Sequence, residues 1–205
     1  MGTDIHGWIE IATELTPRMF TWSAVVSVGL LLDRDYDAFA CLFGVTNYAY
    51  FQPIAPNRDI PSDASEIVQL EIANLAGVPD ALLWPTWIAW SEVQTIDWDE
   101  KTRHPDSRLH RYRREADGHL TYETKAVWSA ELAQITGHTL AEVTKQPPIW
   151  LEGQEWHTDT HVFRAEKLRR QDVLAEDWQM IFTIMKLLAR RFGDQYVRLV
   201  VWFNR

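Results

Sequence analysis

The sequence predicts one domain of mixed α+β structure, in which a single sheet has helices packed on at least one face. Residues 1–11 alternate between apolar and polar side chains, as a half-buried strand does. Residues 176–192 carry a broad apolar stripe at helical spacing. Residues 196–203 are almost continuously apolar, which is typical of a central strand. A helix that leads directly into a buried strand favours a sheet covered by helices.

The N-terminal strand is predicted to have one apolar and one polar face. Ile5, Ile9 and Ile11 share the face expected to enter the core. The opposite face carries Asp4, His6, Trp8 and Glu10. Asp4 and His6 would stand about 6.5–7 Å apart along the backbone, so that both side chains could converge on a metal ion, a water or a polar ligand. A solvated edge strand would show the same pattern, and both interpretations stay open.

Turn and capping residues place the next elements. Thr16-Pro17 predicts a turn, and residues 20–32 predict a second strand antiparallel to the first. Residues 33–36 begin a short helix. A further helix is predicted to begin with Ser62 as its N-cap and to end near Gly77. Residues 82–90 predict a short buried or edge strand, because Pro85 interrupts the apolar run.

The second half of the chain contains a polar and basic segment, predicted to form a hairpin-like insertion at about residues 99–125. Asp117-Gly118 supplies the expected turn. Two short helices follow, one over residues 129–136 and one that opens with the capping box of Thr139. The insertion carries six basic side chains: Lys101, Arg103, Arg108, Arg111, Arg113 and Arg114. They could hold a phosphate, but a solvated flap balanced by nearby acids is favoured.

Composition limits the classes of function. The chain has 205 residues, 46% of them hydrophobic, which is enough for a core without disulfides. The net charge of −9 argues against general nucleic-acid binding and suits a basic protein partner or a metal-bridged ligand. Cys41 is the single cysteine and is predicted to be a small core residue in a reducing compartment. No secretory leader and no membrane-spanning run is recognisable, so a cytoplasmic protein is expected.

A second polar cluster lies in residues 155–163, which alternate like a strand. His157, Asp159 and His161 would share one face of that strand. The two histidines would then be about 13 Å apart, too far for one ion, so Asp159 is expected to pair with either of them or the cluster to meet the N-terminal site. Mixed histidine and aspartate ligation suits zinc, manganese or iron better than calcium. The alternative is cross-strand hydrogen bonding on a polar sheet face.

Arg34 stands beside a turn, where its guanidinium could grip a carboxylate or phosphate in a forked contact. An ion pair with Asp33, Asp35 or Asp37 is the simpler interpretation. The chain has 11 tryptophans, and such an excess suits stacking on a ligand as well as core packing. Glycine-rich phosphate loops, a G-x-S-x-G elbow and a C-x-x-C pair do not occur in the sequence.

Several blocks resemble a family of uncharacterised bacteriophage and bacterial proteins that begin M-G-[CT]-D-I-H. The blocks lie in order at residues 1–6, 34–39, 60–65, 97–98 and 197–203, with Val45 and Asn47 between them. The resemblance implies a phage-related protein but no activity. Thr3 stands where many members have cysteine, so a cysteine nucleophile is not expected there. Residues 83–86 replace a His-Ser stretch of the family, and His157 or His161 could replace that histidine. The D-x-H opening also resembles calcineurin-like metallophosphoesterases, but their later G-D and G-N-H blocks are absent and membership is rejected.

These observations lead to the hypothesis of a metal-assisted hydrolase that acts on a small phosphorylated or nucleotide-like substrate. The predicted site comprises Asp4 and His6 as ligands of a divalent zinc, manganese or iron ion, His157, Asp159 and His161 as catalytic groups, and Arg34 and Trp8 as ligand-binding groups. The alternative is a non-enzymatic binder of a small anionic ligand or a basic partner, such as an immunity, counter-defence or nucleotide-sequestering protein. The sequence does not predict the oligomeric state.

Overall fold

The computed structural model describes residues 2–126 and 128–205, and it confirms the predicted α+β class. The chain divides into two compact units. The first comprises Met1–Val45, Pro53–Asp97 and Leu174–Arg205, and the second comprises Thr46–Gln52 and Trp98–Val173. Each unit contains its own four-stranded antiparallel sheet, so the described residues form two sheets where one was expected. The segment predicted as a hairpin-like insertion lies in the second unit.

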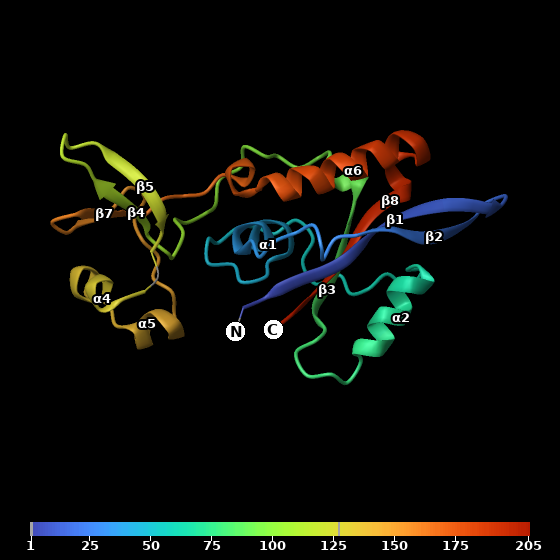
Figure 1. Ribbon diagram of the computed structural model, residues 1–205, viewed down its shortest axis with the longest axis horizontal. Coiled ribbons are helices and arrows are strands. Elements are labelled where there is room, and N and C mark those ends of the chain that lie inside the picture. Colours follow the sequence, from blue (N-terminus) through green and yellow to red (C-terminus); the bar gives the residue numbers. More distant parts are fainter. Residues whose placement is uncertain (1, 127) are drawn as a thin grey trace. The chain divides into compact units, whose positions relative to one another are not determined.

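The sheet of the first unit has the order β2-β1-β8-β3, and all of its strands run antiparallel to their neighbours. Its strands are β1 (Asp4–Thr16), β2 (Met19–Ser27), β3 (Leu83–Ala89) and β8 (Val197–Asn204). β8 lies between β1 and β3 and is buried over every residue except the last, Asn204 (Figure 1). The C-terminal strand is therefore central, as predicted. β3 is an edge strand, which tolerates Pro85 because an edge position needs fewer backbone donors.

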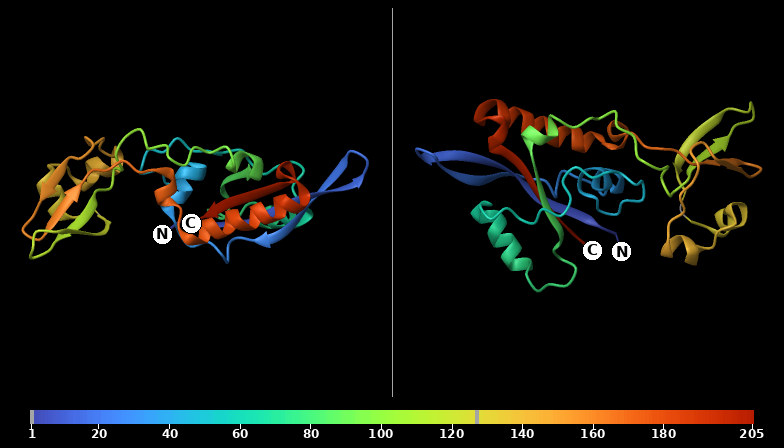
Figure 2. Two further views of the ribbon diagram at one scale, coloured as in Figure 1. Left: turned by 90° about the horizontal axis from the view of Figure 1, so that it is seen from above. Right: turned by 180° about the vertical axis from the view of Figure 1, so that it is seen from behind.

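Helices cover both faces of this sheet. α1 (Tyr36–Phe43) and α6 (Glu176–Phe192) lie on one face, where Phe43 contacts both Trp178 and Phe203 with ring centroids about 6 Å apart. α2 (Glu66–Leu75) covers the other face, where Val68 packs in a cluster with Val200 and Trp202. The views in Figures 1 and 2 place α6 alongside β8. Burial on two faces explains why β8 is apolar at consecutive positions.

Capping residues set the ends of the helices in the first unit. The side chain of Asp35 accepts hydrogen bonds from the first turn of α1, and Gly44 ends that helix in the left-handed conformation. α2 has Ser65 as its N-cap, so the prediction of Ser62 was wrong by one helical turn. α6 ends at Gly193, as predicted. The short helices α3 (Trp90–Val93) and η2 (Asp194–Tyr196) complete the unit.

The sheet of the second unit has the order β5-β4-β7-β6. Its strands are β4 (His110–Arg114), β5 (Leu120–Lys125), β6 (Glu155–His157) and β7 (His161–Arg164). The predicted hairpin around Asp117-Gly118 is present as β4 and β5. α4 (Ala130–Thr136) lies in the range predicted to be helical and has Ser129 as its N-cap, and α5 (Leu140–Lys145) begins at the predicted cap, Thr139. η1 (Arg170–Val173) follows β7 (Figure 2).

A small apolar core holds the second unit together. Leu109, Leu132, Trp150 and Phe163 are its largest fully or nearly fully buried members. In the first unit, Cys41 is buried in α1, as predicted for a small core residue. None of the helices in the described parts of the chain combines the length and apolar character needed to cross a membrane.

Candidate functional sites

The first candidate site lies where β1 begins and β8 ends. Asp4 and His6 project from the same face of β1, as predicted. In the register of the two strands, Asn204 stands directly opposite Asp4, and Trp202 stands opposite His6. The His6 ring stacks on the Trp202 ring, with centroids 6.5 Å apart and an angle of 22° between the planes. The site therefore combines a carboxylate, an imidazole and an amide on one patch of the sheet.

Arg34 binds this site through Asp4. Its Nε and Nη2 atoms both donate to Oδ1 of Asp4, at 3.0 and 2.7 Å. The hydrogen bond to Asp4 raises the pKa of Arg34. Arg34 thus pairs with a carboxylate 30 positions earlier in the chain rather than with a neighbouring aspartate. A Cβ atom at Gly2 would overlap the guanidinium, so glycine at this position leaves room for Arg34.

Two buried polar atoms at this site have no hydrogen-bond partner among the described residues. They are Nε2 of His6 and Oδ1 of Asn204. Both residues line two neighbouring hollows, of about 410 and 280 Å³. The larger hollow also contains Asp4, Asp33 and Arg34. The smaller hollow also contains Glu71, Asn74 and Trp202. Buried polar atoms are almost always satisfied in folded proteins, so these two are the atoms of the site that a water, an ion or a ligand would satisfy.

Trp8 was predicted to contact the ligand of this site. Its indole Nε1 donates to Oε2 of Glu71 at 3.2 Å, and its ring packs against the cluster beneath α2. This contact fixes α2 on the sheet. A role for Trp8 in ligand binding stays a prediction.

The predicted catalytic cluster has a different geometry from the one expected. Residues 155–163 do not form one straight strand, because β6 and β7 pair as a hairpin closed by hydrogen bonds between Thr158 and His161. His157 approaches Glu155 and Arg114, and Asp159 is exposed in the turn. His161 instead lies 3.4 Å from Glu123. The expected shared face of His157, Asp159 and His161 is therefore wrong.

Asp4 and His6 have no third histidine, cysteine or carboxylate grouped with them as a metal ligand among the described residues. In residues 2–126 and 128–205, no three histidine, cysteine, aspartate or glutamate side chains are grouped so that they could hold a metal ion. Asp4 and His6 belong to the first unit, and the β6–β7 hairpin belongs to the second. A metal bound by Asp4 and His6 would need a donor of another type.

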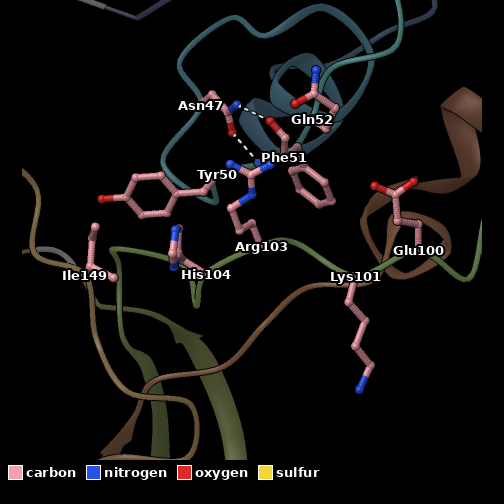
Figure 3. Close-up of a pocket in the computed structure, with 9 residues that line it drawn as sticks. All are labelled: Asn47, Tyr50, Phe51, Gln52, Glu100, Lys101, Arg103, His104 and Ile149. Carbon is pink, nitrogen blue, oxygen red and sulfur yellow. Dashed lines mark hydrogen bonds between the residues drawn. The ribbon is translucent and has the colours of Figure 1, made fainter.

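The second candidate site is a pocket of about 620 Å³ within the second unit (Figure 3). It is lined by polar, aromatic and charged side chains and by one isoleucine: Asn47, Tyr50, Phe51, Gln52, Glu100, Lys101, Arg103, His104 and Ile149. The loop of residues 46–52 forms one wall, and residues 100–104 of the basic segment form another. Sequence reasoning singled out the basic residues but missed the loop that faces them.

Local hydrogen bonds hold the loop in an uncommon conformation. The side-chain amide of Asn47 donates to the carbonyl oxygen of Phe51 at 2.8 Å and accepts from the backbone N–H of Phe51 at 3.0 Å. Thr46 and Tyr50 have φ angles of 54° and 58°, which residues other than glycine rarely adopt. Such backbone conformations cluster at functional sites. These hydrogen bonds therefore hold the loop in a shape that lines the pocket.

Tyr50 is fixed on the wall of this pocket. Its hydroxyl donates to the carbonyl oxygen of Pro147 at 3.2 Å, and its ring meets the edge of the His104 ring at 5.7 Å between centroids. Burial and, to a smaller extent, the charge of Asp106 raise the pKa of Tyr50. The hydroxyl is consequently protonated at neutral pH and acts as a donor to Pro147.

The charges of the pocket are unevenly balanced. Glu100 forms an ion pair with Arg170 at 2.9 Å. The side chains of Lys101 and Arg103 have no hydrogen bond or ion pair within the described part of the chain. In Figure 3 the guanidinium of Arg103 points toward the 46–52 loop, whereas Lys101 extends away from it. The pocket therefore holds an uncompensated positive charge.

The other basic residues of this segment are engaged elsewhere. Arg111 and Arg113 pair with Glu123, and Arg113 also pairs with Glu115. Arg108 binds Asp106 at 2.7 Å. These contacts agree with the prediction of a flap balanced by acids, whereas Lys101 and Arg103 beside the pocket have no acidic partner among the described residues.

Comparisons with protein-family models, with curated proteins and with solved structures find no match to this chain.

Proposed function

We propose that the protein binds a small anionic, nucleotide-like ligand in the pocket of the second unit. The observation that carries the proposal is the guanidinium of Arg103, which points into a pocket with aromatic walls and has no acidic partner among the described residues. A volume of about 620 Å³ lies within the usual range for small-molecule sites.

The chemistry of the lining suits a ligand with a phosphate or carboxylate and a planar ring. A guanidinium donates two parallel hydrogen bonds to such an anion. Tyr50, Phe51 and His104 offer ring surfaces for the planar part. The side-chain amide of Gln52 supplies a further donor and acceptor at the rim. This combination favours a nucleotide over inorganic phosphate alone.

Because the chain is acidic, the unpaired guanidinium of Arg103 determines where an anion can bind. The chain carries a net charge of −9, so its overall field repels anions. An anion would therefore bind only where positive charge is not already neutralised, and Arg103 meets that condition. Binding should weaken as salt concentration rises, because screening reduces the attraction.

Binding is favoured over hydrolysis by the positions of the expected catalytic groups. His157 and His161 lie on the β6–β7 hairpin, where each contacts a glutamate. They are not among the side chains that line the pocket. Metal-assisted hydrolysis stays a prediction, and the pocket supports recognition of the ligand.

The test is calorimetric titration of the full chain with ATP, AMP and inorganic phosphate at about 50 and 200 mM salt. Arg103→Gln should weaken nucleotide binding by roughly tenfold or more, because a hydrogen bond to a charged group contributes about 1.5–3 kcal/mol. Arg113→Gln is the matched control, since Arg113 already pairs with Glu115 and Glu123. Equal affinities of the wild type and Arg103→Gln, or no binding of any of these anions at low salt, would overturn the proposal.

A further inference from the structure

The first candidate site lies on β1 and β8 of the first unit. We infer that Asp4, His6 and Asn204 bind one divalent transition-metal ion, of the zinc or manganese class. This inference does not depend on the anion pocket, because every residue involved belongs to the first unit.

The three donors share one patch of the sheet. Asp4 and His6 are two positions apart on β1, and Asn204 of β8 stands opposite Asp4. Side chains directly opposite each other on antiparallel strands have Cβ atoms about 4.5–5.5 Å apart. A carboxylate oxygen, an amide oxygen and an imidazole nitrogen at these positions are within reach of a common ion. Ligands of this mixed type suit zinc or manganese.

The unsatisfied atoms are those that a metal would use. Nε2 of His6 and Oδ1 of Asn204 are buried and have no hydrogen-bond partner among the described residues. Leaving such an atom unsatisfied is unfavourable, because it has lost its hydrogen bonds to water. Both atoms can donate a lone pair to a cation, and one ion would satisfy both at once. The apolar run of residues 196–203 predicts only a core strand, so Asn204 is not among the expected ligands.

The surrounding charges favour a cation over an anion. The two hollows that share His6 and Asn204 are lined by three acids, Asp4, Asp33 and Glu71. Arg34 is the basic side chain that lines them, and it is bound to Asp4. Its side chain is 44% exposed, so it can rotate into solvent when Asp4 takes another partner. Arg34 therefore competes with the metal for the Asp4 carboxylate.

Because Arg34 and the metal compete for Asp4, some variants are expected to weaken metal binding and others to tighten it. Zinc and manganese chlorides would be titrated into the full chain by calorimetry, and circular dichroism would confirm that each variant is folded. His6→Ala and Asn204→Ala should each weaken binding by at least about tenfold. Arg34→Gln and Asn204→Asp should tighten it, because the first removes a competing cation and the second adds a negative ligand. His157→Gln, which changes an exposed histidine beside Glu155, should leave the affinity unchanged.

The outcomes separate a built site from metal held by surface histidines. One ion per chain with the expected order of affinities supports the site. Binding that survives His6→Ala or Asn204→Ala, or that is lost in His157→Gln, overturns it. Should either alanine variant fail to fold, Arg34→Gln and Asn204→Asp remain decisive, because unchanged or weaker binding in both contradicts the inference.

Discussion

Nε of Arg198 donates a 2.7 Å hydrogen bond to Oε2 of Glu10 and so joins β8 to β1 inside the first unit. The Glu10 side chain is fully buried, and that of Arg198 is only 5% exposed. The other carboxylate oxygen of Glu10 accepts from the backbone N–H of Ser65 at 2.8 Å, immediately before α2. The guanidinium also covers the Trp22 ring at 3.7 Å. One ion pair thus connects the sheet with the start of α2.

Arg198→Met should destabilise the first unit by about 3–5 kcal/mol, because it leaves the buried carboxylate of Glu10 without its counter-ion. The double variant Glu10→Gln/Arg198→Met should recover much of that loss, since glutamine is neutral and still offers an oxygen to Ser65. Urea denaturation of both variants measures the two free energies of unfolding. A double variant no more stable than Arg198→Met would show that the lost charge balance is not the cause.

Two positions on α6 test its packing against the sheet. Ile181 is fully buried, and Leu187 on the same helix is 55% exposed. Ile181→Ala should cost about 2–5 kcal/mol through lost burial and a residual cavity. Leu187→Ala should change the free energy of unfolding by no more than about 0.5 kcal/mol. Chemical denaturation of Ile181→Ala and Leu187→Ala measures both free energies of unfolding. Similar losses in the two variants would contradict the observed orientation of the helix.

The N-terminus of α2 offers a direct comparison between two serines. The hydroxyl oxygen of Ser65 accepts from the N–H of Val68 at 3.4 Å, whereas Ser62 is exposed before the helix. Ser65→Ala should therefore cost about 0.5–2 kcal/mol and Ser62→Ala much less. Thermal unfolding of the two variants provides the measurement. A larger loss of stability for Ser62→Ala than for Ser65→Ala would indicate that Ser62 is the N-cap, as the sequence predicts.

Long periodic segments were predictable because local patterns decide them. The stripe of α6, the apolar run of β8, the helical range of α4 and the cap of α5 all agree with the structure. The N-cap of α2 was not predictable, because Glu10 fixes the backbone of Ser65 from 55 positions away. The hairpin of β6 and β7 was missed for a similar reason. Alternation continues through residues 155–163, and only the bonds between Thr158 and His161 reveal the turn.

The sites were predictable only where their residues share one strand. The common face of Asp4 and His6 follows from strand periodicity. The contributions of Arg34 and Asn204 depend on the placement of the Arg34 loop and on the register of β8, which no local pattern indicates. The pocket of the second candidate site depends on residues 46–52 meeting residues 100–104, so the sequence indicates a basic segment without its opposite wall.

Because of Asp106, the stability of the second unit should depend on pH in the acidic range. Burial alone would raise the pKa of Asp106, but the hydrogen bond from Arg108 and the charges of Arg108 and Lys125 outweigh it and lower the pKa. A carboxyl whose folded pKa lies below its ordinary value of about 3.9 stabilises the fold above that pH. This contribution is lost as the pH falls through the lowered pKa.

Asp106→Asn should consequently destabilise the second unit at pH 7 by up to about 3 kcal/mol, because two cations lose their buried partner. The difference from wild type should shrink as the pH falls below about 4. Urea denaturation at several pH values measures it. A difference that is the same at acidic and neutral pH would contradict the assigned role of the Asp106 charge.

Gly7 sets the close approach of β1 to β8 that brings His6 against Trp202. Its φ angle is +149°, and a Cβ atom there would lie 2.1 Å from the carbonyl oxygen of Val200. Gly7→Ala should therefore cost roughly 2–5 kcal/mol, through backbone strain together with the displacement of one strand from the other. Gly118→Ala is the control, since Gly118 has φ +85° but open space around it.

The control should show only the strain of a left-handed alanine, about 1–2 kcal/mol. Chemical denaturation gives both losses, and amide hydrogen exchange shows where each variant opens. Faster exchange in Gly7→Ala should be concentrated at the β1–β8 hydrogen bonds near Val200, because the added methyl group acts between these two strands. A loss no greater than that of Gly118→Ala would mean that the strands can separate at Gly7 without cost. The close approach of β1 to β8 beside His6 and Trp202 would then need another cause.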